Sequence, residues 1–305
     1  MLKFLKKFLL LAFFALVFTA CLSISGGDER ANVFRLTILH TNDMHGWLQN
    51  VPKYATIVKQ VRSEGGNVLL LDAGDLYRRG RYERFNGAVE TEIFNAMGYD
   101  AITFGNNDFP LSDRELIDVS SHTILHMAEF PVVCANVTID GNYIDGFQPY
   151  IIKEMNGVNV AIIGVTTTSP RDRRADISRR VLFEDPLQVL NRMVLETREK
   201  SDIQIALSHA GFDTDLTMRN VSAIIGGHSH TKLIVPHVIR DRQNRIPVVQ
   251  TGGENDHSIG RLDLVFIKKR GQWVLNEFSG YLFLLHDVEP DMEIQAILDR
   301  YERLL

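Results

Sequence analysis

The pattern of apolar and polar residues divides most of the chain into short apolar runs and longer amphipathic stretches. The apolar runs have the length and composition of buried strands. Polar residues follow at once after five of these runs, at 33–39, 67–71, 101–104, 203–207 and 223–225. We therefore expect buried strands that end in polar loops. A further apolar run, at 130–137, is also typical of a strand.

The amphipathic stretches have apolar residues at helical spacing, which predicts helices that bury one face. They lie at 52–64, 83–97, 112–127, 185–200 and 293–305. Pro52 stands near the start of the first, where a proline is favourable. Ser112, with Glu115 three residues later, has the capping-box pattern of a helix start. Strands and helices in this order predict an α/β fold.

Strands in the second half of the chain are predicted to form hairpins. Asn156-Gly157 separates the runs 150–154 and 158–165, and this dipeptide is typical of a tight hairpin turn. Three more strand-like runs lie at 247–250, 259–268 and 273–285, with a turn expected at 269–271. Parallel strands first and hairpins later predict two sheets packed face to face, with helices outside.

The first 20 residues have the pattern of an export signal. Lys3, Lys6 and Lys7 precede an apolar run at 8–20, which is shorter than the ~20 residues that span a bilayer. The run ends in Phe18-Thr-Ala-Cys21, which resembles a bacterial lipobox. We therefore expect a signal peptide at 1–20, a lipid anchor on Cys21 and a flexible tether at 21–32. The alternative is an ordinary cleaved signal with an incidental cysteine.

Composition narrows the range of partners. The formal net charge is −5, and a mildly acidic protein does not have the basic surface that nucleic-acid polymers need. Small phosphate esters remain compatible with this charge if a metal centre binds them. Cys134 is the only cysteine besides Cys21, so lipidation of Cys21 would leave no disulfide, and Cys134 is expected to be buried.

The polar residues after the strands are the types that bind metal ions. Asp43 and His45 lie two apart, so that in extended backbone they point the same way. Taken alone, this pair is also typical of a helix-capping aspartate and a surface histidine. Four later strands repeat the pattern, and open α/β sheets bind ligands at this end of their strands. The later candidates are Asp75, Asn106, His209, His228 and His230.

These blocks together resemble the 5'-nucleotidase branch of the calcineurin-like metallophosphoesterases, beginning with the stretch 36–48. The resemblance implies a four-layer α-β-β-α sandwich of two mixed sheets over 33–288, with two divalent metal ions. It implies that Asp75 bridges the ions. One ion would be completed by Asp43, His45 and His230, the other by Asn106, His209 and His228. Nitrogen and oxygen ligands suit Mn, Zn, Fe or Co. Close relatives often have glutamine at the position of His230.

The third block departs from the family pattern, Gly-Asn-His-Glu-Phe-Asp. Here it reads Gly105-Asn-Asn-Asp-Phe-Pro110, so Asn107 replaces the catalytic histidine and Pro110 the aspartate that orients it. Asn107 and Asp108 are nevertheless the catalytic candidates. The Asn107 amide can donate a hydrogen bond to a phosphoryl oxygen, but it cannot deliver a proton. General acid catalysis is typically worth ~10²–10⁴-fold, so weakened nucleotidase chemistry is expected.

Candidate substrate-binding residues are less well defined. Asn106 and Asn107 lie in the third block, and His257 lies in a loop that passes near the site by resemblance. Arg78 and Arg79 follow the bridging aspartate, where an arginine could clamp a phosphate. An equally good interpretation of these arginines is a solvated charge cluster.

Two classes of function follow from these features. The first is an exported, envelope-anchored enzyme, periplasmic or on the outer surface, that hydrolyses small phosphate esters, among them nucleotides. The second is a weakly active or inactive metal-binding lipoprotein that binds a phosphorylated ligand or a partner subunit. Thiosulfate-ester hydrolysis is a further enzymatic alternative within the superfamily. Residues 289–305 resemble the helix that leads to a C-terminal domain in the family, and a separate subunit could replace that domain.

Overall fold

The computed structural model describes residues 32–109, 122–168, 181–241 and 244–305. The chain divides into two compact units, Met1–Phe34 and Arg35–Leu305, and the account below concerns the second. The predicted signal peptide, Cys21 and almost all of the tether lie outside the described residues. Within the described part of the chain, no helix is both long and apolar enough to cross a membrane.

The larger sheet has seven strands in the order β16-β15-β1-β2-β3-β4-β7. Strands β1 to β4 and β7 run parallel, whereas β15 and β16 form an antiparallel hairpin beside β1. The late hairpin therefore extends the sheet of early parallel strands, a long-range pairing that the order of elements did not reveal. The strands are β1 (Val33–Thr41), β2 (Asn67–Asp72), β3 (Ala101–Ile102), β4 (Val132–Val133), β7 (Phe147–Gln148), β15 (Gly260–Lys269) and β16 (Gln272–Leu282).

The second sheet has six strands in the order β13-β14-β12-β11-β9-β8. Its four central strands are parallel, and β8 and β13 pair antiparallel at the two edges. The hairpin predicted at Asn156-Gly157 is confirmed as β8 and β9. The strands are β8 (Tyr150–Met155), β9 (Val158–Thr166), β11 (Ile203–His209), β12 (Ala223–Gly226), β13 (His237–Asp241) and β14 (Asn244–Val249).

A third, small sheet was not predicted. It consists of β10 (Val181–Phe183), β5 (Val137–Ile139) and β6 (Asn142–Tyr143). The run at 130–137 is not one strand, because Cys134 N–H bonds to Gln148 O at 2.8 Å and Ala135 N–H to Gly164 O at 2.8 Å. The chain therefore passes from the first sheet to the second within two residues. Cys134 is fully buried, as predicted.

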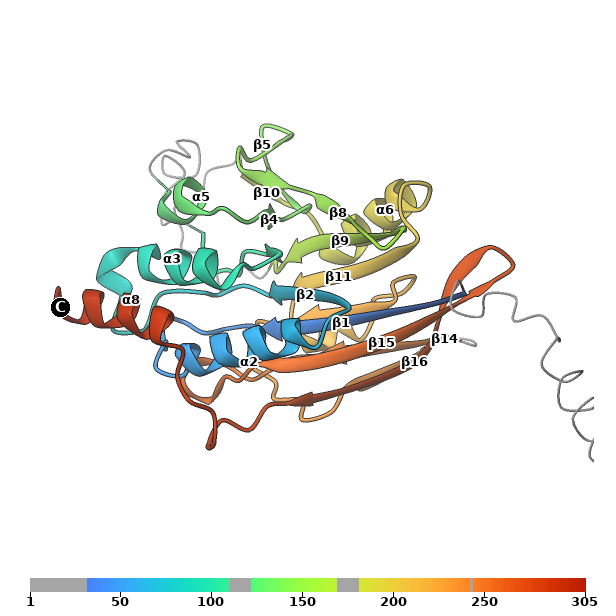
Figure 1. The fold of residues 1–305 in the computed structure, drawn as a ribbon. Coiled ribbons are helices and arrows are strands. Elements are labelled where there is room, and N and C mark those ends of the chain that lie inside the picture. The colour runs from blue at the N-terminus through green and yellow to red at the C-terminus, as the bar shows by residue number, and fades with distance from the viewer. Residues whose placement is uncertain (1–31, 110–121, 169–180, 242–243) are drawn as a thin grey trace, which may run out of the picture. The chain divides into compact units, whose positions relative to one another are not determined.

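The helices cover the sheets as the amphipathic pattern predicts. Helix α6 packs on β9 and β11, and α2 packs on β2 (Figure 1). Two mixed sheets with helices outside give the α-β-β-α arrangement expected from the resemblance. The helices are α2 (Val51–Ser63), α3 (Ala88–Met97), α5 (Thr123–Met127), α6 (Pro186–Thr197), α7 (Phe212–Asp215) and α8 (Met292–Glu302).

Two predicted helices differ from the structure. The stretch 83–97 contains a short 3-10 helix, Glu83–Phe85, and then α3, because Gly87 between them has φ +87° and ends the helical path. Of the helix predicted at 112–127, only α5 lies in the described residues, and Ser112 and Glu115 lie outside them. Asp291 caps the last helix, α8, through its side chain, and α8 packs on α2 and α3.

Candidate metal centre

All seven predicted ligands come from the carboxyl ends of strands in the two large sheets. The loops after β1, β2 and β3 supply Asp43, His45, Asp75 and Asn106 from the first sheet. The end of β11 supplies His209 from the second sheet, and the loop after β12 supplies His228 and His230. The first two loops are joined directly, because Asp43 N–H donates to Gly74 O at 2.8 Å and His45 N–H to Asp75 O at 2.9 Å. The structure therefore brings together residues that the sequence separates by nearly two hundred positions.

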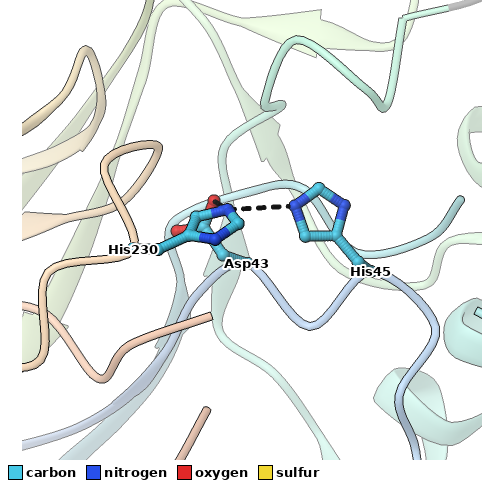
Figure 2. Close-up of side chains that lie close together, drawn as sticks. All are labelled: Asp43, His45 and His230. Carbon is cyan, nitrogen blue, oxygen red and sulfur yellow. Dashed lines mark hydrogen bonds and ion pairs between the residues drawn. The ribbon is translucent and has the colours of Figure 1, made fainter. Parts of the chain in front are cut away.

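One half of the site consists of Asp43, His45 and His230 (Figure 2). His230 Nε2 lies 3.3 Å from Asp43 Oδ1 and 3.2 Å from His45 Nε2. Asp43 and His45 are fully buried, whereas about a third of the His230 side chain is exposed. This half is therefore open to solvent on the side of His230.

The other half consists of Asp75, Asn106, His209 and His228. Asp75 Oδ2 lies 3.4 Å from His209 Nε2, and Asn106 Oδ1 lies 3.2 Å from the same nitrogen and 3.0 Å from His228 Nδ1. Asp75 Oδ2 also lies 3.4 Å from His45 Nε2. One carboxylate oxygen is thus equidistant from a histidine of each half, where a bridging ligand has to lie.

These separations fit metal ligation. Two ligand atoms that each lie ~2.1 Å from one ion at a tetrahedral angle are about 3.4 Å apart. Asp43, His45 and His230 offer nitrogen and oxygen atoms within 4.8 Å of one another, and so do Asp43, Asp75 and His209. Neutral imidazoles and carboxylates are the usual ligands of Zn and Mn. The donor set therefore suits divalent ions of this kind.

The backbone at the site is held in an uncommon conformation. A left-handed backbone costs a non-glycine residue about 1–2 kcal/mol, and such strain gathers at functional sites. Five of the candidate ligands have it: Asp43 at φ +51°, His45 at +49°, Asp75 at +57°, His228 at +73° and His230 at +52°. The loops turn sharply at these residues, which allows ligands close in sequence to point into one small volume.

The charged groups at the centre of the site shift one another's pKa values. Burial would raise the pKa of Asp75, but His209 and His45 beside it hold that pKa below its ordinary value. Burial would lower the pKa of His209, but the Asp75 carboxylate raises it to about 10. Each of the two groups therefore favours the charged form of the other. A histidine that binds a metal ion has to be neutral, so metal binding would compete with protonation of His209.

Asp108, a predicted catalytic residue, lies behind Asp75. Its Oδ2 accepts hydrogen bonds from the backbone N–H of Asp75 at 2.6 Å and of Gly105 at 2.9 Å, and its Oδ1 accepts from Leu76 N–H at 2.9 Å. The side chain is fully buried. Burial and the neighbouring Asp75 charge raise its pKa to about 7. These contacts give Asp108 a positioning role for Asp75.

Asn107 lies against the Asp75 carboxylate. Its backbone N–H donates to Asp75 Oδ1 at 2.7 Å, and its side-chain Nδ2–H donates to Asp75 Oδ2 at 2.8 Å. The residue is half-buried. Asn107 thus places hydrogen-bond donors at the centre, and it has no proton to transfer. Pro110, the other departure, lies outside the described residues.

The two arginines lie in different surroundings. Arg78 Nη2 donates to Phe109 O at 3.0 Å and to Tyr77 Oη at 3.2 Å, so its guanidinium supports the loop. Arg79 Nη1 lies 3.0 Å from Glu254 Oε1, and Glu254 N–H donates to Asp43 O at 2.8 Å. The Arg79 side chain is half exposed. Arg79 is therefore the arginine placed at the rim of the metal centre.

His257 is not among the residues that the structure brings into the cluster. It is buried, and its two ring nitrogens are both engaged: Nε2 with Trp47 O at 2.6 Å, and Nδ1 with Tyr54 Oη at 3.0 Å. Burial lowers its pKa to about 4. These contacts secure the loop that follows His45, and they leave no ring nitrogen free for substrate.

Sequence reasoning missed residues that support the ligands. Asn42 Nδ2 donates to Asp43 Oδ2 and to Gly252 O, both at 2.7 Å, so it fixes the first carboxylate. Gln250, fully buried, bonds to the loop that contains His228 and His230. Each of these polar residues directly follows an observed strand, Asn42 after β1 and Gln250 after β14.

A pocket of about 750 Å³ adjoins the loop that follows His45. Its walls come from residues 46–49, from the loop that contains Arg79, Arg81 and Tyr82, and from one face of α8. Trp47 and Tyr82 are aromatic residues of these walls. Arg79 lies both in the pocket wall and at the rim of the metal centre. The pocket is large enough for a small organic molecule.

Comparison with known proteins identifies the family of the chain. A family model for calcineurin-like phosphoesterases matches residues 36–232, and the chain belongs to that family. Calcineurin-like phosphoesterases use divalent metal ions. The chain is 30% identical to the Trifunctional nucleotide phosphoesterase protein YfkN of Bacillus subtilis over 88% of this chain and 21% of that protein. It is 29% identical to the 5'-nucleotidase of Diplobatis ommata over 81% of this chain and 49% of that protein.

Solved structures show the same likeness. The 5'-nucleotidase precursor from Thermus thermophilus superposes with a TM-score of 0.78 at 28% identity, over 88% of this chain and 59% of that one. The chain thus spans about half the length, or less, of the curated relatives that it matches. The family and the fold of the N-terminal domain follow from these comparisons.

Proposed function

We propose that the chain hydrolyses small phosphate esters at a dinuclear metal centre, in the manner of a 5'-nucleotidase. The observation that carries this proposal is the position of Asp75 Oδ2, which lies 3.4 Å from both His45 Nε2 and His209 Nε2. Phosphate esters hydrolyse very slowly, and a centre of this kind supplies a hydroxide at neutral pH and positive charge for the phosphoryl oxygens.

The residues of the chain have separate roles in this proposal. Asp75 bridges the two halves, held by Asp108 from behind. Asp43, His45 and His230 complete one half, and Asn106, His209 and His228 the other. Asn107 supplies N–H groups beside the phosphoryl group. Arg79 lies at the rim and binds a phosphate oxygen once its ion pair with Glu254 opens. That ion pair is exposed, and such pairs contribute only ~0–1 kcal/mol.

The pocket beside residues 46–49 receives the leaving group in this proposal. The relatives named above are nucleotidases and a nucleotide phosphoesterase, so nucleotides are one class of substrate to test. Trp47, partly exposed in the pocket wall, offers aromatic surface to a flat ring. Other small phosphate esters with an apolar leaving group fit the same description.

Metal content and hydrolysis test the proposal together. We expect the purified chain, reconstituted with Mn²⁺ or Zn²⁺, to hold two ions per chain by elemental analysis. With added Mn²⁺ it should hydrolyse members of a panel that contains p-nitrophenyl phosphate, nucleoside monophosphates and nucleoside diphosphates. Metal content near zero after reconstitution would overturn the proposal.

A second function is favoured by the contacts of Asn107. Both of its donors bond to Asp75, and neither can protonate a leaving group. A weakly active or inactive metal-binding lipoprotein, which binds a phosphorylated ligand or a partner subunit, would have such a site. Two bound ions without turnover of any ester in the panel would select this alternative.

We infer that the chain is exported and anchored to the cell envelope through Cys21. The basic start, the short apolar run and the lipobox-like Phe18-Thr-Ala-Cys21 support this inference. Cys21→Ser should release the protein from the membrane fraction or leave it unprocessed, measured by fractionation and by the mass of the mature protein. The matched control is Cys134→Ser, which should keep the membrane association. If Cys21→Ser alters neither fractionation nor mass, the anchor lies elsewhere.

A further inference from the structure

We propose that Gln250 is a positioning residue that holds His228 and His230, one ligand of each half of the centre, in the geometry that binds metal. The inference rests on the proposed metal centre and adds a residue that no ligand pattern includes. Gln250 is fully buried at the end of β14, the strand beside β12. It contacts the loop at 227–231, the ligand loop, which contains His228 and His230, and it is not a ligand itself.

The amide of Gln250 bonds to three residues that flank the two histidines. Its Nε2–H donates to Gly227 O at 3.2 Å, immediately before His228. Its Oε1 accepts from Ser229 Oγ–H at 2.9 Å, between the two ligands, and from Thr231 N–H at 3.2 Å, immediately after His230. One side chain therefore fixes the loop at the positions before, between and after the ligands.

The ligand loop needs such support because both histidines are in the left-handed region, with φ +73° at His228 and +52° at His230. Strained backbone of this kind persists only where the surrounding structure fixes it. Without the amide, the loop could relax toward ordinary φ values, and the imidazoles would then turn away from Asp43 and Asn106. Gln250 thus acts on metal binding through the backbone.

The same network reaches a third ligand, His209. Gln250 Nε2 lies 3.4 Å from Asp215 Oδ2, and Asp215 Oδ1 accepts from Ser208 Oγ–H at 2.6 Å. Ser208 Oγ in turn accepts from Ala210 N–H at 3.2 Å, so the residues on both sides of His209 are fixed. A Cβ at Gly226 would lie 2.8 Å from Gln250 Nε2, so the network also requires a glycine there.

Only an amide satisfies all of these contacts, because Gln250 donates and accepts at the same time. Leucine has a similar size but would leave Gly227 O and Thr231 N–H without this partner. Glutamate would keep the acceptor, but it would lose the donor to Gly227 and place a second carboxylate beside Asp215. These differences allow positioning to be separated from simple packing.

The test compares metal affinity among variants of the whole chain. Gln250→Leu should bind Zn²⁺ about 10–100-fold more weakly than wild type by calorimetry, which is the usual effect of losing a residue that orients ligands. The visible spectrum of the Co²⁺-substituted protein should change, because it reports ligand geometry. The melting temperature of the metal-free protein should change little by comparison with the loss of metal-induced stabilisation.

Gln204→Leu is the matched control, since Gln204 lies on β11 of the same sheet and, among the described residues, its side-chain amide bonds to Ser201 alone. It should keep wild-type affinity and the wild-type Co²⁺ spectrum. Ser229→Ala, at an exposed position, removes the bond from Ser229 Oγ–H to Gln250 together with the contacts of that oxygen with Phe212 N–H and Thr231 Oγ1. It should weaken Zn²⁺ binding by about 5-fold even if Gln250→Leu does not fold.

The outcomes separate this inference from the proposed function. If wild type binds no metal, the proposed function fails, and the role of Gln250 fails with it. If wild type binds two ions and Gln250→Leu binds them with the same affinity and the same Co²⁺ spectrum, only the positioning role is overturned. If Gln250→Leu does not fold and Ser229→Ala binds Zn²⁺ as tightly as wild type, it is likewise overturned.

Discussion

Asp75→Asn should weaken binding of Mn²⁺ or Zn²⁺ by more than ~100-fold and abolish hydrolysis of p-nitrophenyl phosphate. Residues that only orient ligands cost ~10–100-fold when lost, and Asp75 is itself the proposed shared ligand. The substitution removes the charge that lies 3.4 Å from both His45 and His209. It also places an amide N–H where a lone pair is needed. Calorimetry and elemental analysis measure the loss.

Asp241→Asn is the control for this variant, because Asp241 ends β13, an edge strand of its sheet, where it pairs with Asn244 in a hairpin. It should keep both ions and full activity. An Asp75→Asn protein that still holds two ions at wild-type affinity would show that Asp75 does not bridge them.

The wild-type chain should hydrolyse p-nitrophenyl phosphate with a kcat/KM that exceeds its kcat/KM for AMP by ~10²–10⁴-fold. The reason is the leaving group. A nucleoside 5'-oxygen leaves as a poor alkoxide unless it receives a proton, and Asn107 has none to give. Aryl oxides and phosphate are stable anions that need less help, so nucleoside diphosphates should also be preferred to monophosphates.

Asn107→His together with Pro110→Asp should raise activity on AMP while p-nitrophenyl phosphate changes little. The control is Asn276→His, a partly exposed asparagine on β16, which should leave the ratio of the two substrates unchanged. Circular dichroism should first show that the double variant is folded. Equal wild-type rates on AMP and p-nitrophenyl phosphate would mean that another group supplies the proton. His257 is then a poor candidate, because both of its nitrogens are engaged.

The clustering of the candidate ligands could be predicted from the sequence because its signal is local. Each ligand follows an apolar strand within a few residues, and a strand end can be recognised without knowing its neighbours. Asp43 and Asp75 illustrate this, since the loops after β1 and β2 meet simply because the two strands are adjacent and parallel. The fold class followed for the same reason, from strands and helices read one at a time.

What the sequence did not reveal depends on long-range pairing. The hairpin of β15 and β16 joins the sheet beside β1, more than two hundred residues earlier in the chain. The contacts of His257 with Trp47 and Tyr54 span a similar separation. Asp108 was predicted to take part in catalysis because of its place in the motif, whereas its side chain accepts hydrogen bonds from the backbone of Asp75 and Leu76, 33 and 32 residues earlier in the chain.

The proposed centre draws its ligands from both large sheets, so a bound metal ion would link the two sheets. Asp43 and Asp75 belong to one sheet, and His209 and His228 to the other. An ion held by residues of both sheets is a crosslink across the interface between them. Any preference of the ion for the folded state adds directly to the free energy of unfolding, by about 2.7 kcal/mol when the ion is present at ~100 times its Kd. Supply of metal would then govern how long the folded protein persists as well as whether it can react.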